Sequence, residues 1–486
     1  MLTADYLIAT DDLKEVPRCV YKGKHLFFAQ GPVTWDSNGR RVRNPYSNVG
    51  CYLMTQSDEQ ALTVDSATFV NSFFPNDCYA HTLYEDESFA WYHGGRNLFD
   101  ATLMEPGDPH NYSLALPAIG VAGRSKGVLR VAISSDATTT VSVAVGDSGV
   151  GKVSIKSSPK YSKGNTGEAL FTLPRLESTN KVTLTVTQGS AARLDFIDLQ
   201  AITPEELVTV PIERQCGSPS FLYRITNQDL HAHQPVEMII IIPTSQQLRE
   251  QAERLKTLHE ERDNMSVRIV PADELFNEFS SATPDATAYK RYLKMLYDRA
   301  VTADEAPRYL VLFGDGAWDN RMCSSNWRQY SPDDFLLCYE SENSFSETDC
   351  YVTDDFFCLL DDGEQLVSGV SFRAMADMAV GRFPVRTAAE AKVMVDKVED
   401  YMNNTEAGAW QNTVAFMGDD GNNNIHMNDA EKAATIVESN RPAYEVKRIY
   451  WDAYNRASSS TGHTYPEAQA LVNQLMNNGA LMMNYS

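Results

Sequence analysis

The sequence lacks a long apolar run and is poor in basic residues. No stretch approaches the roughly 18 consecutive apolar residues of a transmembrane helix, and the longest runs, such as Val236 to Ile242, have the length of strands. The 42 basic residues against 65 acidic ones give a net charge of −23. This charge repels nucleic acid and anionic lipid, so neither is an expected partner.

The cysteines lack the spacing of a metal or redox site. No Cys-x-x-Cys pair and no metal-type cysteine and histidine spacing occurs, which argues against zinc and against a redox dithiol. Their number does not fix the compartment, and Cys19, Cys51 and Cys78 could supply a disulfide in an exported protein. The cysteines are Cys19, Cys51, Cys78, Cys216, Cys323, Cys338, Cys350 and Cys358.

The C-terminal end of the sequence suggests a fragment, and the N-terminal end leaves two interpretations open. The first ten residues lack the basic and long apolar regions of a secretory signal, so the protein is cytosolic or its front end is missing. The last residues, Gly479 to Ser486, have the pattern of a buried parallel strand. Functional groups in α/β proteins follow the carboxyl ends of such strands, so we expect the sequence to stop where the chemistry begins.

The first part of the chain has the pattern of β structure. From Lys24 to Ala201, short runs alternate apolar and polar residues between Gly, Asn, Asp and Ser, and residues 127–200 have the strand spacing of a β-sandwich. The cluster Gly146 to Lys152 is expected to form a turn, because a strand and not a helix follows it, which excludes a phosphate-binding loop.

The second part alternates strands and helices, which predicts a parallel, doubly wound sheet. We predict four domains or segments: an N-terminal β-rich domain (1–110), a β-sandwich (111–203), a connector (204–225) and an α/β domain (226–486) that is incomplete at its C-terminus. The expected strands are 236–242, 266–270, 309–313, 378–381, 413–417 and 479–486, and the expected helices are 244–261, 285–299, 388–402 and 428–439.

Three acidic loops follow strands of this sheet, so we expect them to meet along one edge. The candidate residues are Asp315 and Asp319 in the first loop, Asp354 and Asp355 in the second, and Asp419, Asp420 and His426 in the third. Such residues can hold calcium, magnesium or a hydrolytic metal pair, but Asp, Gly and Asn are also ordinary turn and capping residues. His426 falls at a helix start, where an imidazole often only bonds a nearby carbonyl.

Four other residues are of types that act as metal ligands or nucleophiles. His231 and His233 are expected on one side of an incipient strand, without a third ligand nearby, so a solvated strand end is the preferred interpretation. Cys358 lies in an apolar run and is expected to be an inert core thiol, and Cys216 lies in the connector, away from any strand-end cleft.

Several motifs, in this order, resemble those of the gingipain-type cysteine peptidases, and within that family they are most similar to the sortases of the Bacteroidetes type IX secretion system. The motifs are Phe313-Gly-Asp-Gly-Ala-Trp-Asp-Asn, Thr353-Asp-Asp-Phe-Phe, Val380-Gly-Arg-Phe-Pro-Val, Gly418-Asp-Asp-Gly and Gly479-Ala-Leu-Met-Met-Asn-Tyr-Ser, with Phe276-Asn-Glu-Phe-Ser-Ser in support. The resemblance covers about residues 205–486 well.

This resemblance implies a caspase-like α/β domain and a thiolate that attacks a peptide carbonyl. In the family, the strand ending Asn-Tyr leads into a Gly-His-Gly motif with the catalytic histidine, and the cysteine follows later, so both are expected beyond Ser486 and this chain should be inactive alone. The implied substrate-pocket residues are Asp419, Asp420, His426 and Asp315. Asn422, Asn423 and Asn424 stand where a further acidic residue is expected, which argues against strict arginine recognition.

The resemblance also implies partners and a location. The family's sortases remove C-terminal secretion domains from cargo proteins and attach the cargo to a lipopolysaccharide-type surface glycolipid, at the outer membrane or cell surface. No cofactor is expected, and structural calcium at the acidic loops is left open.

Two other functions remain open from the sequence. One is a metal-dependent hydrolase that uses the acidic loops, with Asp319, Asp354 and Asp355 as weak metal-ligand candidates. The other is a non-catalytic surface-binding module, which an exposed aromatic strip involving Trp91 or Tyr92 would support.

Overall fold

The computed structural model describes residues 15–486 apart from 28, 37, 55, 57, 59, 67, 70–77, 117–125, 203–216, 226–227, 365, 367–373 and 460–461. The chain divides into two compact units, Met1–Val395 and Asp396–Ser486, and each is described by itself. The helix α5 (Ala388–Asn403) crosses the boundary between them.

The first unit begins with two small antiparallel hairpins. Strand β1 (Arg18–Tyr21) pairs with β2 (Lys24–Phe27), and β3 (Val33–Trp35) pairs with β4 (Arg41–Arg43). Cys19, Leu26 and Phe69 form a small core beside the first hairpin.

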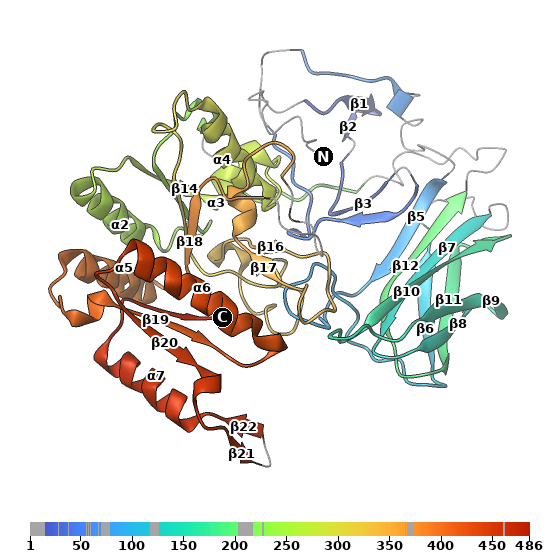
Figure 1. The fold of residues 1–486 in the computed structure, drawn as a ribbon. Coiled ribbons are helices and arrows are strands. Elements are labelled where there is room, and N and C mark those ends of the chain that lie inside the picture. The colour runs from blue at the N-terminus through green and yellow to red at the C-terminus, as the bar shows by residue number, and fades with distance from the viewer. Residues whose placement is uncertain are drawn as a thin grey trace. The chain divides into compact units, whose positions relative to one another are not determined.

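A β-sandwich of two antiparallel four-stranded sheets follows, and Figure 1 shows it in light blue and green. Its sheets have the orders β10-β7-β12-β5 and β6-β11-β8-β9. Alternate residues such as Leu129, Val131 and Leu184 point into one shared core. The strands are β5 (Cys78–Glu85), β6 (Pro109–Ala115), β7 (Gly127–Ser135), β8 (Thr139–Val145), β9 (Ser148–Ile155), β10 (Asn165–Leu173), β11 (Thr179–Gln188) and β12 (Arg193–Ile202).

The sandwich occupies more of the chain than residues 111–203. Strand β5 pairs with β12, and the predicted boundary between residues 110 and 111 falls inside β6. Gly146, with a φ of 58°, and Asp147 form the turn between β8 and β9, whereas Ser148 to Lys152 of the predicted turn cluster lie in β9, so the turn is shorter than predicted.

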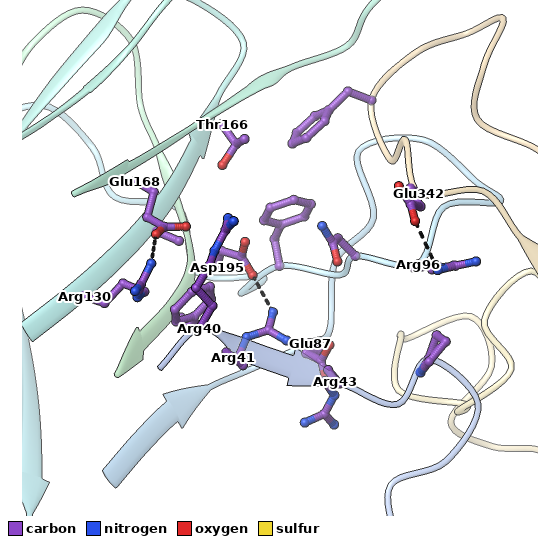
Figure 2. Close-up of a pocket in the computed structure, with 16 residues that line it drawn as sticks. Arg40, Arg41, Arg43, Glu87, Arg96, Arg130, Thr166, Glu168, Asp195 and Glu342 are labelled. Carbon is purple, nitrogen blue, oxygen red and sulfur yellow. Dashed lines mark hydrogen bonds and ion pairs between the residues drawn. The ribbon is translucent and has the colours of Figure 1, made fainter. Parts of the chain in front are cut away.

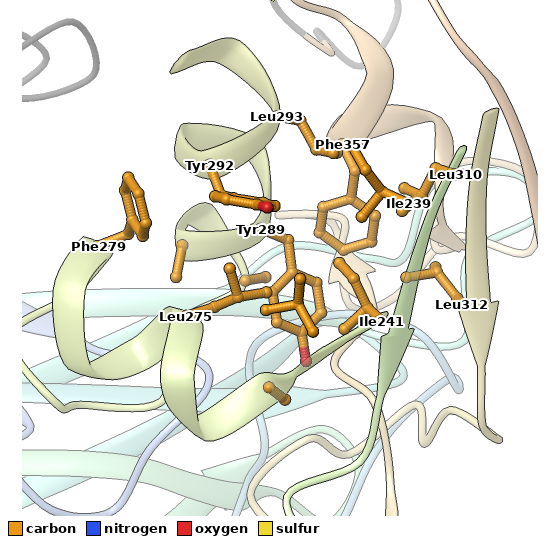
Figure 3. Close-up of a cluster of buried hydrophobic side chains, with 14 of the residues drawn as sticks. Ile239, Ile241, Leu275, Phe279, Tyr289, Tyr292, Leu293, Leu310, Leu312 and Phe357 are labelled. Carbon is orange, nitrogen blue, oxygen red and sulfur yellow. The ribbon is translucent and has the colours of Figure 1, made fainter. Parts of the chain in front are cut away.

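The first unit also contains a parallel sheet of order β14-β13-β15-β18. Ile239 and Ile241 of β13 pack with Leu310 and Leu312 of β15 against α3 and α4, as Figure 3 shows. The elements are β13 (Met238–Ile242), α2 (Arg249–Arg262), β14 (Val267–Pro271), α3 (Ala272–Phe279), α4 (Thr287–Arg299), β15 (Tyr309–Phe313), β16 (Tyr339–Glu340), β17 (Val352–Thr353) and β18 (Ala379–Phe383).

The second unit has a parallel sheet of order β20-β19-β23 with a helix on each face. Val414 and Phe416 of β19 pack against α6, whereas Met417 packs with Ile449 and with Ala468 of α7. The elements are β19 (Thr413–Gly418), α6 (Ile425–Asn440), β20 (Glu445–Tyr450), β21 (Ala457–Ser459), β22 (Gly462–Thr464), α7 (Pro466–Asn478) and β23 (Met482–Tyr485).

The fold is therefore multidomain, with antiparallel β structure first and parallel α/β structure after it, as the sequence predicts. One local prediction is wrong: His231 lies in the short 3-10 helix Leu230–Ala232, not in a strand, because Asp229 caps that turn by accepting from the Ala232 amide. Within the described residues, no helix has both the length and the apolar character needed to span a bilayer.

Candidate functional site

The acidic loops fall into different units. Asp315, Asp319, Asp354 and Asp355 belong to the first unit, and the loop that follows β19 belongs to the second. Since each unit is described by itself, the meeting of all three loops along one edge stays a prediction.

The loop after β19 lies beside the end of β23. These strands are parallel, with Met417 opposite Tyr485, and the Ser486 amide donates to the Met417 carbonyl at 3.1 Å. The Tyr485 hydroxyl donates to Oδ2 of Asp419 at 2.6 Å, and the Gly421 amide donates to Oδ1 at 2.8 Å. Both carboxylate oxygens of Asp419 are therefore fixed at the carboxyl edge of the sheet.

These hydrogen bonds set the charge of Asp419. The bond from Tyr485, followed by the one from the Gly421 amide, lowers the pKa of Asp419 below its usual value. The same bond to the carboxylate raises the pKa of Tyr485 to about 12. Asp419 is consequently an anion at neutral pH, and Tyr485 keeps its proton.

The second carboxylate of the loop is held by a second tyrosine. The Tyr465 hydroxyl, at the start of α7, donates to Oδ2 of Asp420 at 2.9 Å. Trp451 lies between the two tyrosines, with ring centroids 5.4 Å from Tyr465 and 5.7 Å from Tyr485. Asp420 itself is exposed, so its carboxylate remains accessible to a substrate.

The rest of the loop orients His426. Asn422, Asn423 and Asn424 all have left-handed backbone, with φ between 51° and 62°, a conformation that Asn tolerates better than most residues. The amide nitrogen of Asn422 donates to Nε2 of His426, the second residue of α6, at 3.0 Å. This contact suits a neutral imidazole that accepts at Nε2.

The carboxylates of the first unit have local partners. Asp315 accepts from the Gly316 amide at 2.9 Å and has Oδ2 3.5 Å from Nε of Arg386. Asp354 holds Arg382 through two contacts of 2.9 and 2.8 Å.

The remaining metal-ligand candidates are also local structure. Asp319 is buried and accepts from the Ser324 amide at 2.6 Å, and Asp355 begins a short 3-10 helix, Asp355–Cys358. Among the residues that the structure describes, no group of three or more His, Cys, Asp or Glu side chains could hold a metal ion.

His231 and His233 act as separate packing residues. Nδ1 of His231 lies 2.6 Å from Glu278 and its ring stacks on Phe279, whereas Nδ1 of His233 lies 2.9 Å from the Tyr292 hydroxyl. They share no ligand. Trp91 is likewise engaged, because its Nε1 donates to Ser134 at 2.9 Å and its ring contacts Phe89 edge-on.

Five of the described cysteines do not have the environment of a nucleophile. Burial raises the pKa of Cys338 and Cys350 to about 11 and that of Cys358 to about 12, and it also raises the pKa of Cys51 and Cys323. A reactive thiol needs a lowered pKa. Cys358 is fully buried, as predicted for a core thiol, and Cys216 lies outside the described residues. Cys19 and Cys51 are free thiols.

Sequence reasoning missed both tyrosines of the acidic loop. In the sequence, Tyr485 stands out only as part of the Asn-Tyr motif, and nothing marks Tyr465. The apolar run Ala480 to Met483 could have placed Tyr485 at the strand end, but the contact with Asp419 depends on the parallel register of two strands far apart in sequence.

Residues 231–486 match the model of peptidase family C25. The chain therefore belongs to peptidase family C25, the gingipain-type cysteine peptidases, as the sequence motifs predict. Comparison with curated proteins gave no match.

The solved structure of dimeric latent PorU from Porphyromonas gingivalis is similar to this chain, with 25% identity and a TM-score of 0.65. The match covers 82% of this chain and 46% of PorU, so the chain spans about half the length of that relative. A structure described as a protease, 16% identical with a TM-score of 0.29 and covering 44% of this chain and 40% of its own, is too dissimilar to carry an argument.

Proposed function

We propose that this chain forms part of a cysteine endopeptidase and transpeptidase of the type IX sortase kind. Membership of family C25 and the likeness to PorU support this proposal. The observation that carries it is the bond between Asp419 and Tyr485, because in the family the strand ending Asn-Tyr leads into the catalytic histidine. The acidic loop is thereby fixed beside the strand that leads into the catalytic site.

The loop acts in this proposal as a wall of the substrate cleft. Asp420 is exposed, so its carboxylate can contact a basic or hydrogen-bonding side chain of the peptide. Asp419 is held by Tyr485 and Gly421 and supports the loop, while Asn422 of the loop orients His426.

The reaction proceeds by attack of a cysteine thiolate on the peptide carbonyl, which forms an acyl-enzyme and releases the amine side of the peptide. Water or an amine acceptor then takes the acyl group. The raised pKa values of five described cysteines support a nucleophile other than these, and we propose that residues 1–486 are inactive alone.

The proposed substrates are cargo proteins with a C-terminal secretion domain, and the proposed acceptor is a lipopolysaccharide-type glycolipid. The protein would then work at the outer membrane or cell surface, or after secretion, beside other secretion components. The reaction needs no cofactor, and a structural calcium ion at the acidic loops stays a prediction. The caspase-like arrangement of the α/β region is part of the same proposal.

The test measures peptide cleavage by the product of the full coding sequence. Three proteins are compared: the unsubstituted protein, the variant Asp420→Asn and the control variant Asp429→Asn. Asp429 is an exposed residue of α6 that pairs with Lys432 at 2.8 Å. We expect Asp420→Asn to lower kcat/KM at least about tenfold for peptides with Lys or Arg at the cleavage site, since one charge-assisted contact is lost. Peptides with a neutral residue there should be cleaved equally by all three proteins. Equal loss for both kinds of peptide would contradict the assigned role of Asp420, and no cleavage by the unsubstituted protein would contradict the proposed function.

A further inference from the structure

A cavity of about 580 Å³ lies in the first unit, where the N-terminal hairpin β3-β4, the sandwich and the segment after β16 meet. Small-molecule sites commonly have volumes of about 300–1,000 Å³. Five arginines line this cavity: Arg40, Arg41, Arg43, Arg96 and Arg130. Four carboxylates line it as well, so its wall has an excess of positive charge in a chain of net charge −23.

Two of these arginines, Arg41 and Arg130, are buried and held by neighbouring side chains. Arg41 contacts Asp195 at 3.5 Å and lies 4.5 Å from the ring centre of Phe196, and Arg130 pairs with Glu168. Figure 2 shows these pairs on adjoining walls of the cavity. Guanidinium groups fixed in this way lose little conformational entropy when they bind a ligand.

These carboxylates do not satisfy all of the arginine donors. The side chains of Arg41 and Arg130 are each only 8% exposed, and the Nε of each has no hydrogen-bond partner within the described part of the chain. Buried donors without a partner are uncommon in folded proteins. Two arginine residues that line this cavity therefore each have an Nε donor that no described residue accepts from.

Two arginines at the cavity remain available for a ligand. Arg40 is exposed, and its charge interacts with the neighbouring Asp36 carboxylate, but within the described residues the two side chains form no direct ion pair. Arg96 is anchored through Nε, which donates to the Glu340 carbonyl at 2.9 Å. Its Nη1 lies 3.6 Å from Glu342, whose side chain is 84% exposed, and such an exposed pair is easily replaced by another anion.

We propose that this cavity binds a small oxyanion, a phosphate or carboxylate group of a ligand, through the guanidinium of Arg40 and with Arg96 as a second contact. The planar fork of a guanidinium matches both groups with two parallel hydrogen bonds. The acidic character of the chain as a whole makes non-specific attraction of anions weak, so binding depends on this local cluster.

Asp195 gives the site a dependence on pH. Burial raises the pKa of Asp195 to about 7. The charged groups that face Asp195 are Arg41 of β4, Glu85 at the end of β5, Glu87 just after β5, and Glu168 of β10. Protonation below about pH 7 removes a negative charge from the cavity. An anion of constant charge should therefore bind more tightly at pH 6 than at pH 8.

The test is calorimetric titration of the protein with glucose 6-phosphate, glucuronate and uncharged glucose. We expect saturable binding of at least one of the two anions and weaker or no binding of glucose. Preference for the first anion assigns a phosphate ligand, and preference for the second assigns a carboxylate. Arg40→Gln should weaken anion binding at least about tenfold, because one charge-assisted pair is lost.

The matched control is Arg175→Gln, which changes an exposed arginine of the sandwich whose partner is Glu177 and which does not line the cavity. It should bind the anions as the unsubstituted protein does. The proposal is overturned if neither anion binds at millimolar concentration, if glucose binds as tightly as the anions, or if Arg40→Gln and Arg96→Gln both leave binding unchanged. Glucuronate affinity that does not rise between pH 8 and pH 6 would remove Asp195 from the account.

Discussion

Tyr485 connects the acidic loop to the sheet through a single hydroxyl group. Its hydrogen bond to Asp419 joins two residues that are 66 positions apart in the chain. This bond lowers the pKa of Asp419 and raises the pKa of Tyr485. The position of this loop therefore depends on one side chain of β23 as well as on the loop's own sequence.

Replacing Tyr485 by Phe should raise the pKa of Asp419 toward its ordinary value, because the largest cause of its lowering is removed. Titration of the Asp419 carboxyl by NMR measures this change. Tyr401→Phe is the control, since Tyr401 is 62% exposed in the same unit. An unchanged pKa of Asp419 in Tyr485→Phe would show that this hydrogen bond does not form in solution.

At the scale of residues, the acidic side chains of the loop could be identified from the sequence, but their hydrogen-bond partners could not. Asp419, Asp420 and His426 could be named because Gly-Asp-Asp-Gly follows an apolar strand. The partners Tyr465 and Tyr485 could not, since their contacts depend on how α7 and β23 lie against β19. The arginine cavity was missed for the same reason: Arg40, Arg96 and Arg130 come from separate elements.

The turn from β19 into α6 is the element that sets the loop's path. A Cβ at Gly418 would lie 2.9 Å from Cα and N of Met427 and 3.0 Å from the carbonyl carbon of His426. All of these are backbone atoms, so a side chain at this position forces the strand and the helix apart.

Gly418→Ala should therefore destabilise the second unit by about 1–3 kcal/mol, the usual cost of overpacking. It should also lower the pKa of Tyr485 from about 12 toward 10, because the displaced loop loses its bond to that hydroxyl. Thermal unfolding and ultraviolet titration of tyrosine measure the two effects. Gly381→Ala is the control, as its Cβ would meet nothing within 4 Å, and a Gly418→Ala protein as stable as this control would refute the steric argument.

An ion-pair cluster joins α6 to β20. Nε of Arg448 lies 2.8 Å from Glu431, and its two terminal nitrogens each lie 2.8 Å from Glu438. The Tyr450 hydroxyl donates to Glu431 at 2.7 Å, and Arg448 and Tyr450 together lower the pKa of Glu431 to about 2.

Arg448→Met should lower the free energy of unfolding by about 1 kcal/mol at pH 7, a small value because the glutamates are half exposed. A depressed folded-state pKa stabilises the fold above the ordinary value of 4.5, and the contribution is lost as pH falls toward about 2. The difference between variant and unsubstituted protein should thus shrink over that range in denaturant titrations. Arg441→Met, which breaks no ion pair with a described residue, is the control. A difference that is constant with pH would contradict the electrostatic explanation.

At the scale of elements, periodicity predicted the strands better than the helices. The apolar runs 236–242, 309–313 and 413–417 correspond to β13, β15 and β19 within two residues. The helix expected from Thr244 begins only at Arg249, and α3, α7 and β20 were not predicted. Helix α3 and strand β20 are short, so their formation depends on packing against neighbouring elements. Helix α7 has apolar residues at helical spacing, Ala468, Leu471, Val472 and Leu475, so its pattern was present in the sequence.

The whole molecule combines antiparallel β structure with parallel α/β structure, and that arrangement was predictable. The change in pattern near Thr203 separates strands that alternate apolar and polar residues from strands that are apolar throughout, and these two patterns are typical of antiparallel and buried parallel sheets. How much of the chain each domain takes was less predictable, because β5 joins the sandwich from the preceding region.

The most direct test of the account is to label the product of the full coding sequence with a thiol-reactive peptide that carries a basic residue, and to locate the label by mass spectrometry. We expect one labelled cysteine, different from Cys19, Cys51, Cys323, Cys338, Cys350 and Cys358. Labelling should be slower in Asp420→Asn and unchanged in Asp429→Asn. A label on one of those six cysteines, or no peptide-dependent label at all, would contradict the proposed cysteine peptidase and its acidic substrate wall.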